Sequence, residues 1–280
     1  MIHELKAALF LARHPSNLPG AFITKVMSQR RLREALYHYV DWRDRGILMQ
    51  AEPICVPPAA LRFRVHGDLS VRSFLESGGQ CSQDLKDALA KVGKDINSFQ
   101  RILDFGCGCG RTLIGLANIV QPSTLFGTDI DAEAIEWCRH HLHFASFETN
   151  DPLPPLNHPA DTFDLIYAIS VFTHLNEDYQ FAWLSELERV TKSKGYVLLT
   201  VHGAYYWDKI PPSKVEEVKR TGLLFMSGSK SMQGIFPDWY QTAFHTQEYV
   251  LSNYSKYFDV LAYIPSGMDN CQDIVVLQKA

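Results

Sequence analysis

The feature that most constrains the fold is a short apolar strand that runs directly into a cluster of glycines. Residues 102–105 are mostly apolar, and glycines follow at positions 106, 108 and 110. Apolar side chains then recur at helical spacing until Gln121 and Pro122 end the pattern. Because glycine has no side chain, a strand, a glycine loop and a helix in this order let the backbone approach a bound ligand closely.

Predicted strands and helices alternate after this loop. Further strands are expected at 124–129, 143–148, 164–170 and 196–201, with helices at 132–141 and 179–191. Strands that are apolar on both faces and are separated by helices indicate a parallel sheet with right-handed crossovers.

The C-terminal tail follows a different pattern. A helix is expected at 246–254, and strands follow at 258–264 and 274–278 with only a short turn-rich segment between them. Two strands joined in this way are predicted to be antiparallel. The predicted fold class is therefore α/β, with a doubly wound, mostly parallel seven-stranded sheet and an antiparallel C-terminal strand.

The segment that precedes the sheet has a helical pattern of its own. An amphipathic helix is expected near Ser28–Arg45 and another helix at Asp84–Val92. Prolines at 53, 57 and 58 exclude a long regular element between them. Residues 1–99 are thus predicted to form an N-terminal helical region in front of the main domain.

Composition limits the partners of the chain. Lys and Arg number 27 against 31 Asp and Glu, and the net charge of -4 argues against a whole-domain grip on nucleic acid or an anionic membrane. The apolar run Ala7–Ala12 is too short to span a bilayer and is not followed by a signal-peptide cleavage site. The six cysteines form no CxxC pair, so reduced thiols and no metal site are expected. We therefore expect a cytoplasmic protein that contacts no membrane.

An acidic residue distinguishes the glycine loop from dinucleotide-binding loops. Those loops have the spacing GxGxxG after an apolar strand, whereas here the spacing is GxGxG and Asp104 stands two residues before Gly106. A buried carboxylate suits a ligand that carries positive charge and would repel a pyrophosphate. The loop therefore argues against the main enzymatic alternative, an NAD-dependent oxidoreductase.

Four segments of the chain resemble a known family, the class I S-adenosylmethionine-dependent methyltransferases, in the branch whose fourth strand ends in Ser-Val-Phe-Thr-His-Leu. The similar segments, in the family's order, are RILDFGCGCGR, LFGTDIDAEAI, TFDLIYAISVFTHL and LERVTKSKGYVLLTVHG. The resemblance covers residues 100–202. It implies a Rossmann-like domain over 100–280 that binds S-adenosyl-L-methionine and releases S-adenosyl-L-homocysteine, with residues 1–99 as a cap on the cofactor pocket.

The resemblance also implies roles for individual residues. The glycine loop lies under the cofactor, Asp104 is directed to its methionine amino group, and Asp129 binds both ribose hydroxyls. Asn150 or Asp151 contacts the adenine, and we favour Asn150 because an amide both donates and accepts hydrogen bonds. Turn or helix-cap chemistry is the alternative for Asp129, since Asp131 beside it suits a cap. The expected cofactor-binding residues are Asp104, Gly106, Cys107, Gly108, Gly110, Asp129, Ile130, Asn150, Asp151 and Ser170.

A long connection follows the predicted fifth strand of the sheet. Residues 203–245 hold eight aromatic side chains and four glycines, and a connection of this length favours a lid over the site. The alternative is that the aromatic side chains form the core of an inserted subdomain. Ser213 and Glu216 have capping-box spacing, which predicts a short helix at Ser213–Arg220 that ends at Gly222.

The methyl acceptor is expected at the carboxyl ends of the strands. Histidine is the usual proton acceptor for a hydroxyl or an amine, and each histidine here is also open to a structural role. The cluster at 140–143 has no carboxylate at ligand spacing and predicts no metal site. We expect at least one of Trp239, Tyr240 and His245 to touch the substrate. The candidate catalytic residues are His174, His202, His245 and Tyr240.

The predicted function is transfer of a methyl group to a small-molecule acceptor with an oxygen or nitrogen nucleophile, by in-line displacement. Positioning supplies most of the rate of such a reaction, so a general base is optional. Two alternatives stay open at this point. One is the NAD-dependent oxidoreductase that the loop opposes, and the other is a protein that binds the cofactor without turnover.

Overall fold

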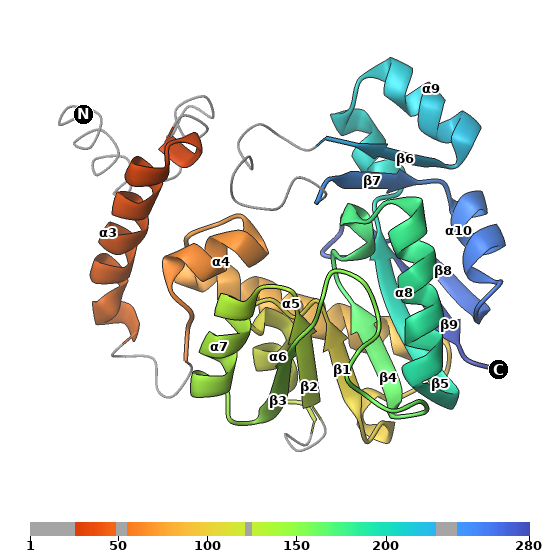
Figure 1. The fold of residues 1–280 in the computed structure, drawn as a ribbon, viewed down its shortest axis with the longest axis horizontal. Helices are drawn as coiled ribbons and strands as arrows, with labels where there is room; N and C mark the ends of the chain where they lie inside the picture. Colours follow the sequence, from red (N-terminus) through yellow and green to blue (C-terminus); the bar gives the residue numbers. More distant parts are fainter. Residues whose placement is uncertain (1–25, 49–54, 121–124, 228–239) are drawn as a thin grey trace. The chain divides into compact units, whose positions relative to one another are not determined.

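The computed structural model describes residues 26–48, 55–120, 125–227 and 240–280 (Figure 1). Contacts divide the chain into two compact units. The larger unit comprises the described residues within Leu75–Met226 and Gln241–Ala280. The smaller unit comprises the described residues before Leu75, together with Ser227 and Tyr240. No helix in the described ranges is long and apolar enough to cross a membrane.

Helices build the described part of the smaller unit. They are α3 (Arg30–Leu48), α4 (Ala59–His66) and the start of α5 (Val71–Lys91). Leu32 of α3 is buried against Leu36, and the ring of Tyr37 meets that of Phe63 on α4 with centres 6.2 Å apart. The amphipathic helix expected near Ser28–Arg45 is therefore confirmed, with a shift of a few residues at each end.

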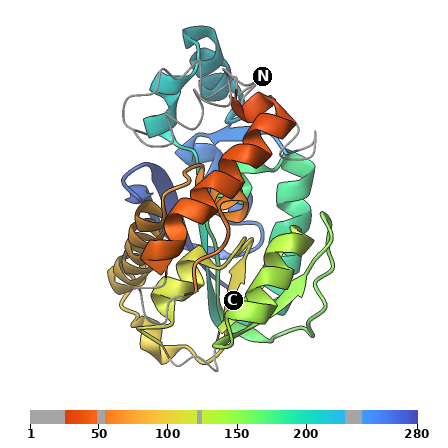
Figure 2. The same cartoon turned by 90° about the vertical axis from the view of Figure 1, so that its left-hand side faces the viewer.

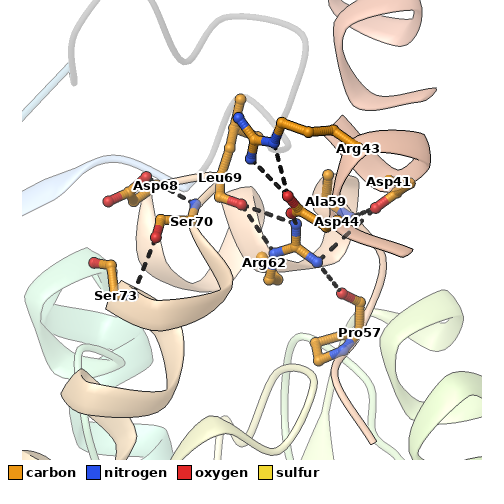
Figure 3. Close-up of polar contacts among 10 residues, drawn as sticks. All are labelled: Asp41, Arg43, Asp44, Pro57, Ala59, Arg62, Asp68, Leu69, Ser70 and Ser73. Carbon is orange, nitrogen blue, oxygen red and sulfur yellow. Dashed lines mark hydrogen bonds and ion pairs between the residues drawn. The ribbon is translucent and has the colours of Figure 1, made fainter. Parts of the chain in front are cut away.

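A buried ion pair joins α3 and α4 (Figure 3). The guanidinium of Arg62 is fully buried and donates to the carboxylate of Asp44 at 2.9 Å. It also donates to the backbone carbonyls of Pro57 at 2.6 Å and of Leu69 at 2.8 Å. Because an unpaired buried charge is strongly destabilising, this network fixes how the two helices and the segment before α5 pack together.

The larger unit is built on a seven-stranded sheet. Its strands are β1 (Ile102–Phe105), β2 (Leu125–Asp129), β3 (Ala145–Thr149), β4 (Phe163–Ala168), β5 (Thr191–Val201), β8 (Asp259–Met268) and β9 (Gln272–Gln278). Their order across the sheet is β3-β2-β1-β4-β5-β9-β8. The first five strands are parallel, and β9 runs antiparallel to both β5 and β8. The predicted fold class and the antiparallel C-terminal pair are confirmed.

Helices cover both faces of the sheet, which explains why its strands are apolar on both sides. The helices α5, α6 (Arg111–Leu116) and α7 (Ala132–His141) share one buried core with the strands. The helix α8 (Glu177–Val190) covers the other face, where its Trp183 packs on Phe105 with ring centres 4.5 Å apart. Figure 2 shows α5 and α8 on opposite sides of the strands.

The helix expected at Asp84–Val92 is only the last part of α5, which begins at Val71. Gly78 and Gly79 lie inside this helix. A side chain at Gly78 would collide with the backbone carbonyl of Arg111 on α6. The glycine therefore permits close packing of two helices, although a glycine pair normally indicates a turn.

The connection between β5 and β8 folds into a subdomain. Its elements are η5 (Ala204–Lys209), α9 (Pro212–Thr221), β6 (Leu223–Met226), β7 (Thr242–His245) and α10 (Gln247–Tyr254). The strands β6 and β7 pair antiparallel. Val218, Leu224 and Phe244 form a buried cluster, with Tyr206 and Trp207 packed against it. These contacts fit the alternative in which the aromatic side chains form the core of a subdomain.

The start of α9 differs from the prediction. The helix begins at Pro212, and no side chain makes a cap hydrogen bond there, so the predicted capping box of Ser213 and Glu216 is wrong. Proline suits the first helical position because its backbone angle is preset and it has no N–H to satisfy. The predicted end at Gly222, with φ +81°, is confirmed. Outside the described residues lie the predicted features Ala7–Ala12, Pro53, Gln121, Pro122, Gly228, Gly234, Phe236 and Trp239.

Candidate active site

The carboxyl ends of the five parallel strands meet at one edge of the sheet, and the glycine loop follows β1 there. Gly106, Gly108 and Gly110 have φ of +81°, +53° and +79°, in the left-handed region that favours glycine. A side chain at Gly106 would collide with Val171, and one at Gly110 would lie 2.6 Å from Leu142. Backbone conformation therefore favours glycine at all three positions, and lack of space also requires it at Gly106 and Gly110.

The carboxylate of Asp129 is held in place from two directions. The N–H of Gly108, in the loop after the neighbouring strand, donates to Oδ2 at 2.7 Å, and the N–H of Asp131 donates to Oδ1 at 2.8 Å. Burial raises the pKa of Asp129, and these two hydrogen bonds oppose the rise. The cap of α7 is supplied by Asp131, whose side chain accepts from the N–H of Ala134. Asp129 makes one turn contact, but it also bridges to the glycine loop.

The peptide of Gly108 is held on its carbonyl side as well. The thiols of Cys107 and Cys138 both donate to its carbonyl oxygen, at 3.6 Å and 3.7 Å. Burial raises the pKa of both thiols, so they stay protonated donors. The sulfur of Cys107 lies against Gly127 of the neighbouring strand β2, so close that a side chain in place of Gly127 would be 2.8 Å from it. Both thiols therefore support the loop from within the core, and the sequence did not reveal this role of Cys138.

Asp104 is a second acid at this edge of the sheet, and it is 3% exposed. Burial raises its pKa to about 8, and the nearby charge of Asp129 adds to the rise. The hydroxyl of Tyr167 opposes the rise, yet its oxygen is buried without a regular hydrogen bond to any described residue. A neutralised carboxyl group beside an unpaired hydroxyl suits a cationic group such as an ammonium, which would favour the ionised acid.

The two residues after β3 differ in how much hydrogen-bonding capacity they retain. The side chain of Asn150 accepts from the hydroxyl of Thr128 at 2.6 Å and donates to the carbonyl of Asp151 at 2.8 Å. Asp151 is exposed. The geometry therefore leaves the carboxylate of Asp151 more open to a ligand than the amide of Asn150.

Ser170 follows β4 with φ +59°, an uncommon conformation for a residue other than glycine. Its N–H donates to the hydroxyl of Thr200 on β5 at 2.8 Å, and its hydroxyl accepts from Gln272 at 2.6 Å. Strained backbone that neighbours hold in place is concentrated at functional sites. Ile130 follows Asp129 and is half-buried at the same edge.

Two of the candidate histidines lie together. The rings of His174 and His202 meet edge to face with centres 6.1 Å apart. Nδ1 of each bonds a backbone carbonyl, that of Gln241 at 2.7 Å and that of Ala243 at 3.2 Å. A carbonyl only accepts, so these nitrogens carry the proton. Nε2 of His202 then keeps a lone pair, for which the described residues provide no hydrogen-bond partner.

Burial lowers the pKa of His174 to about 4 and that of His202 to about 3, with His174 and His245 adding to the shift at His202. His245 is fully enclosed, its Nε2 bonds the side chain of Gln180, and burial lowers its pKa to about 3. All three rings are therefore neutral at pH 7. The enclosure of His245 favours a structural role, and Tyr240 belongs to the smaller unit.

The histidines at the end of α7 bond the backbone. Nδ1 of His140 and of His141 each lie 2.8 Å from the carbonyl oxygen four residues before, on Glu136 and Trp137. Among the described residues, no three His, Cys, Asp or Glu side chains are grouped so that they could hold a metal ion.

Comparison with known proteins identifies this region of the chain. Residues 102–195 match a family described as a methyltransferase domain. The chain is 30% identical over 102 residues to the fatty-acid O-methyltransferase of Mycolicibacterium smegmatis, which is 36% of each protein. It is 32% identical over 73 residues to the rRNA N(6)-adenosine-methyltransferase of Caenorhabditis elegans, which is 24% of this chain and 34% of that enzyme. The chain thus covers only about a third of the length of these relatives.

The fold is also similar to that of solved structures. The magnesium protoporphyrin IX methyltransferase of Synechocystis superposes with a TM-score of 0.52 at 15% identity, over 78% of this chain and 93% of that one. Strand order, glycine loop and acids at the strand ends all agree with the match over residues 102–195. Residues 102–195 therefore form a methyltransferase domain, in a chain with the Rossmann-like fold of class I S-adenosylmethionine-dependent methyltransferases.

Proposed function

We propose that this protein transfers the methyl group of S-adenosylmethionine to a small-molecule acceptor with an oxygen or nitrogen nucleophile. The observation that carries the proposal is the carboxylate of Asp129, fixed by the N–H of Gly108 at the edge where the glycine loop opens. Two oxygens held in this way suit the two adjacent hydroxyls of a ribose, because hydrogen bonds to a charged acceptor are strong.

The other residues of the edge suit the remaining parts of the cofactor. Asp104 would take the ammonium group, and the glycine loop would lie under the cofactor. Asp151 would accept from the adenine amino group, with Asn150 holding the turn through Thr128. This assignment replaces the preference for Asn150, because the amide of that residue is already engaged. When bound, the cofactor supplies a methyl group on a positively charged sulfur.

The chain's own contribution to the chemistry is to orient the acceptor and to receive its proton. In the displacement the bond from carbon to sulfur breaks as the bond from carbon to the nucleophile forms, and the proton of the nucleophile must leave. Nε2 of His202 is suited to receive it, because its lone pair is free and Nδ1 is fixed by the carbonyl of Ala243. Burial lowers the pKa of His202 to about 3, so this lone pair is unprotonated at pH 7 but only weakly basic, and orientation of the acceptor supplies most of the rate.

A small acceptor is favoured over a nucleic acid. The rRNA enzyme among the relatives acts on a nucleic acid, but a net charge of -4 does not favour binding to a phosphate backbone. The fatty-acid relative is an O-methyltransferase, which supports an oxygen nucleophile. The oxidoreductase alternative is opposed by the GxGxG spacing of the loop, which differs from the GxGxxG spacing of dinucleotide-binding loops.

Calorimetric titration of the full chain with S-adenosylhomocysteine and with NAD tests the cofactor. Binding of the first and not of the second is expected, and the reverse would overturn the proposal. Turnover separates an enzyme from a protein that only binds the cofactor. With S-adenosylmethionine and a mixture of small alcohols and amines, we expect the protein to release S-adenosylhomocysteine. Release that occurs with RNA and not with small molecules would refute the acceptor class.

A further inference from the structure

Gln272 lies at the edge of the sheet where β4 and β5 end and β9 begins. It is the first residue of β9, and its neighbour Asp273 pairs with Val201, the last residue of β5. Its amide nitrogen donates to the hydroxyl of Ser170, which follows β4 on the other side of β5. The side chain therefore crosses the end of β5, where ligands of parallel sheets bind.

One polar atom of this amide has no partner. Oε1 of Gln272 is buried, and no described residue donates a hydrogen bond to it. Buried polar atoms are nearly always paired, so an orphaned one beside a ligand site indicates a group that the ligand supplies. The orientation of the amide is set by two neighbours. Nε2 donates to the hydroxyl of Ser170 at 2.6 Å, and the amide lies beside the hydroxyl of Tyr206, whose proton goes to Cys271, so a flipped amide would set Oε1 against a second acceptor.

Gln272 is linked through Tyr206 to His202, the residue that we propose as proton acceptor. Its amide lies beside the hydroxyl of Tyr206, which donates to the sulfur of Cys271 at 3.3 Å. The ring of Tyr206 lies against that of His202 with centres 4.0 Å apart. Gln272, Tyr206 and His202 therefore form one continuous wall of uncharged groups.

The chemistry of this wall limits the group that Oε1 can receive. An ionised carboxylate has no proton to donate to it. A cation is disfavoured because the ammonium of Lys209 lies 4.4 Å from the centre of the Tyr206 ring and lowers the pKa of His202. A neutral donor, either a hydroxyl or an amide N–H, remains.

We propose that Gln272 is the specificity-determining residue for the acceptor, an inference that rests on the proposed function. The acceptor is then a neutral molecule with a hydroxyl or amide donor in addition to its nucleophile. The donor bonds Oε1 of Gln272 while the nucleophile faces His202. A site built to hydrogen-bond a donor rejects analogues that lack it by large factors, since the buried acceptor is then left unpaired.

The test uses the full chain with S-adenosylmethionine labelled in its methyl group and the low-molecular-weight fraction of a cell extract, with products separated and identified by mass spectrometry. Gln272→Met removes the amide while keeping the length of the side chain. The matched control is Gln278→Met at the other end of the same strand, where the amide bonds the carbonyl of Lys194 at 3.1 Å. We expect Gln272→Met to lower labelling at least 100-fold with unchanged affinity for S-adenosylhomocysteine, and Gln278→Met to change neither.

The identified acceptor is then compared with an analogue whose second donor is capped by a methyl group. The wild type is expected to discriminate at least 100-fold in kcat/KM, and Gln272→Met less than 10-fold. Gln272→Ala gives the same test if the Met variant does not fold. If the wild-type products carry no second donor, or if the variants discriminate as strongly as the wild type, the proposed role of Gln272 is refuted. The proposed function of the protein is unaffected by either result. A wild type that binds S-adenosylhomocysteine but labels nothing overturns the proposed function as well.

Discussion

Replacing Asp129 by alanine tests the cofactor assignment most directly. The side chain accepts hydrogen bonds from Gly108 and Asp131, and we propose that it also accepts from two ribose hydroxyls. Hydrogen bonds to a charged group contribute about 1.5–3 kcal/mol, so Asp129→Ala should weaken binding of S-adenosylhomocysteine by roughly 10- to 150-fold. Isothermal titration calorimetry at pH 7.5 measures the affinity, and thermal unfolding of the same samples measures stability.

The variant also leaves the N–H groups of Gly108 and Asp131 without their acceptor, so a loss of stability alone would prove little. Asp131→Ala is the matched control, because it removes the cap of α7 at a cost of about 1 kcal/mol and leaves the Asp129 carboxylate in place. The control should lose stability and keep its affinity for the ligand. Equal affinities of Asp129→Ala and the wild type, or equal losses of affinity in both variants, would refute the ribose assignment.

Three further outcomes are expected. Affinity for S-adenosylhomocysteine should rise roughly tenfold per pH unit from pH 6 towards 8. The ammonium of the ligand requires an ionised Asp104, and the raised pKa of Asp104 keeps this group protonated below about pH 8. Calorimetry should find no such dependence on pH in Asp104→Asn. Cys138→Ala should weaken the same binding by about 0.5–1.5 kcal/mol, since Gly108 loses a donor to its carbonyl, and Cys138→Ser should restore it. Arg62→Met should lower the free energy of unfolding in urea by about 1–3 kcal/mol, because the buried Asp44 loses one guanidinium partner and keeps Arg43, and adding Asp44→Leu should recover part of the loss.

The parts of the fold that are local in sequence could be predicted from it. Strand positions, the order of strand and helix, the loop glycines and the antiparallel tail all follow from hydrophobic period and turn chemistry within about ten residues, as hydrophobic periodicity is the main sequence signal. Asp104 was found from its place two residues before Gly106, and the roles of Asp104 and Asp129 came from the resemblance to the methyltransferase family. Their confirmed position at one edge follows from parallel pairing of β1 and β2.

The features that were missed depend on contacts distant in sequence. Gly78 looks like a turn residue until Arg111 is seen against it. Cys138 looks like an ordinary helix residue, although its thiol bonds the loop 30 residues away. Gln272 lies 102 residues from Ser170, and nothing near either residue suggests that they meet. The spacing of glycines, acids and apolar residues cannot reveal pairings of this kind.

The two edges of the sheet treat polar groups in opposite ways, and this contrast separates function from structure. At the amino edge, Asp164 accepts from the N–H groups of Gln100 and Arg101 and from Lys192, so its charge is fully compensated. At the carboxyl edge, Asp104 is held largely neutral by burial, and Oε1 of Gln272 is unpaired. A fold optimised only for stability would satisfy both edges alike. Natural sequences break local rules mainly where function requires it, and under the proposed function Asp104 and Gln272 are two such residues at the edge that would hold cofactor and acceptor.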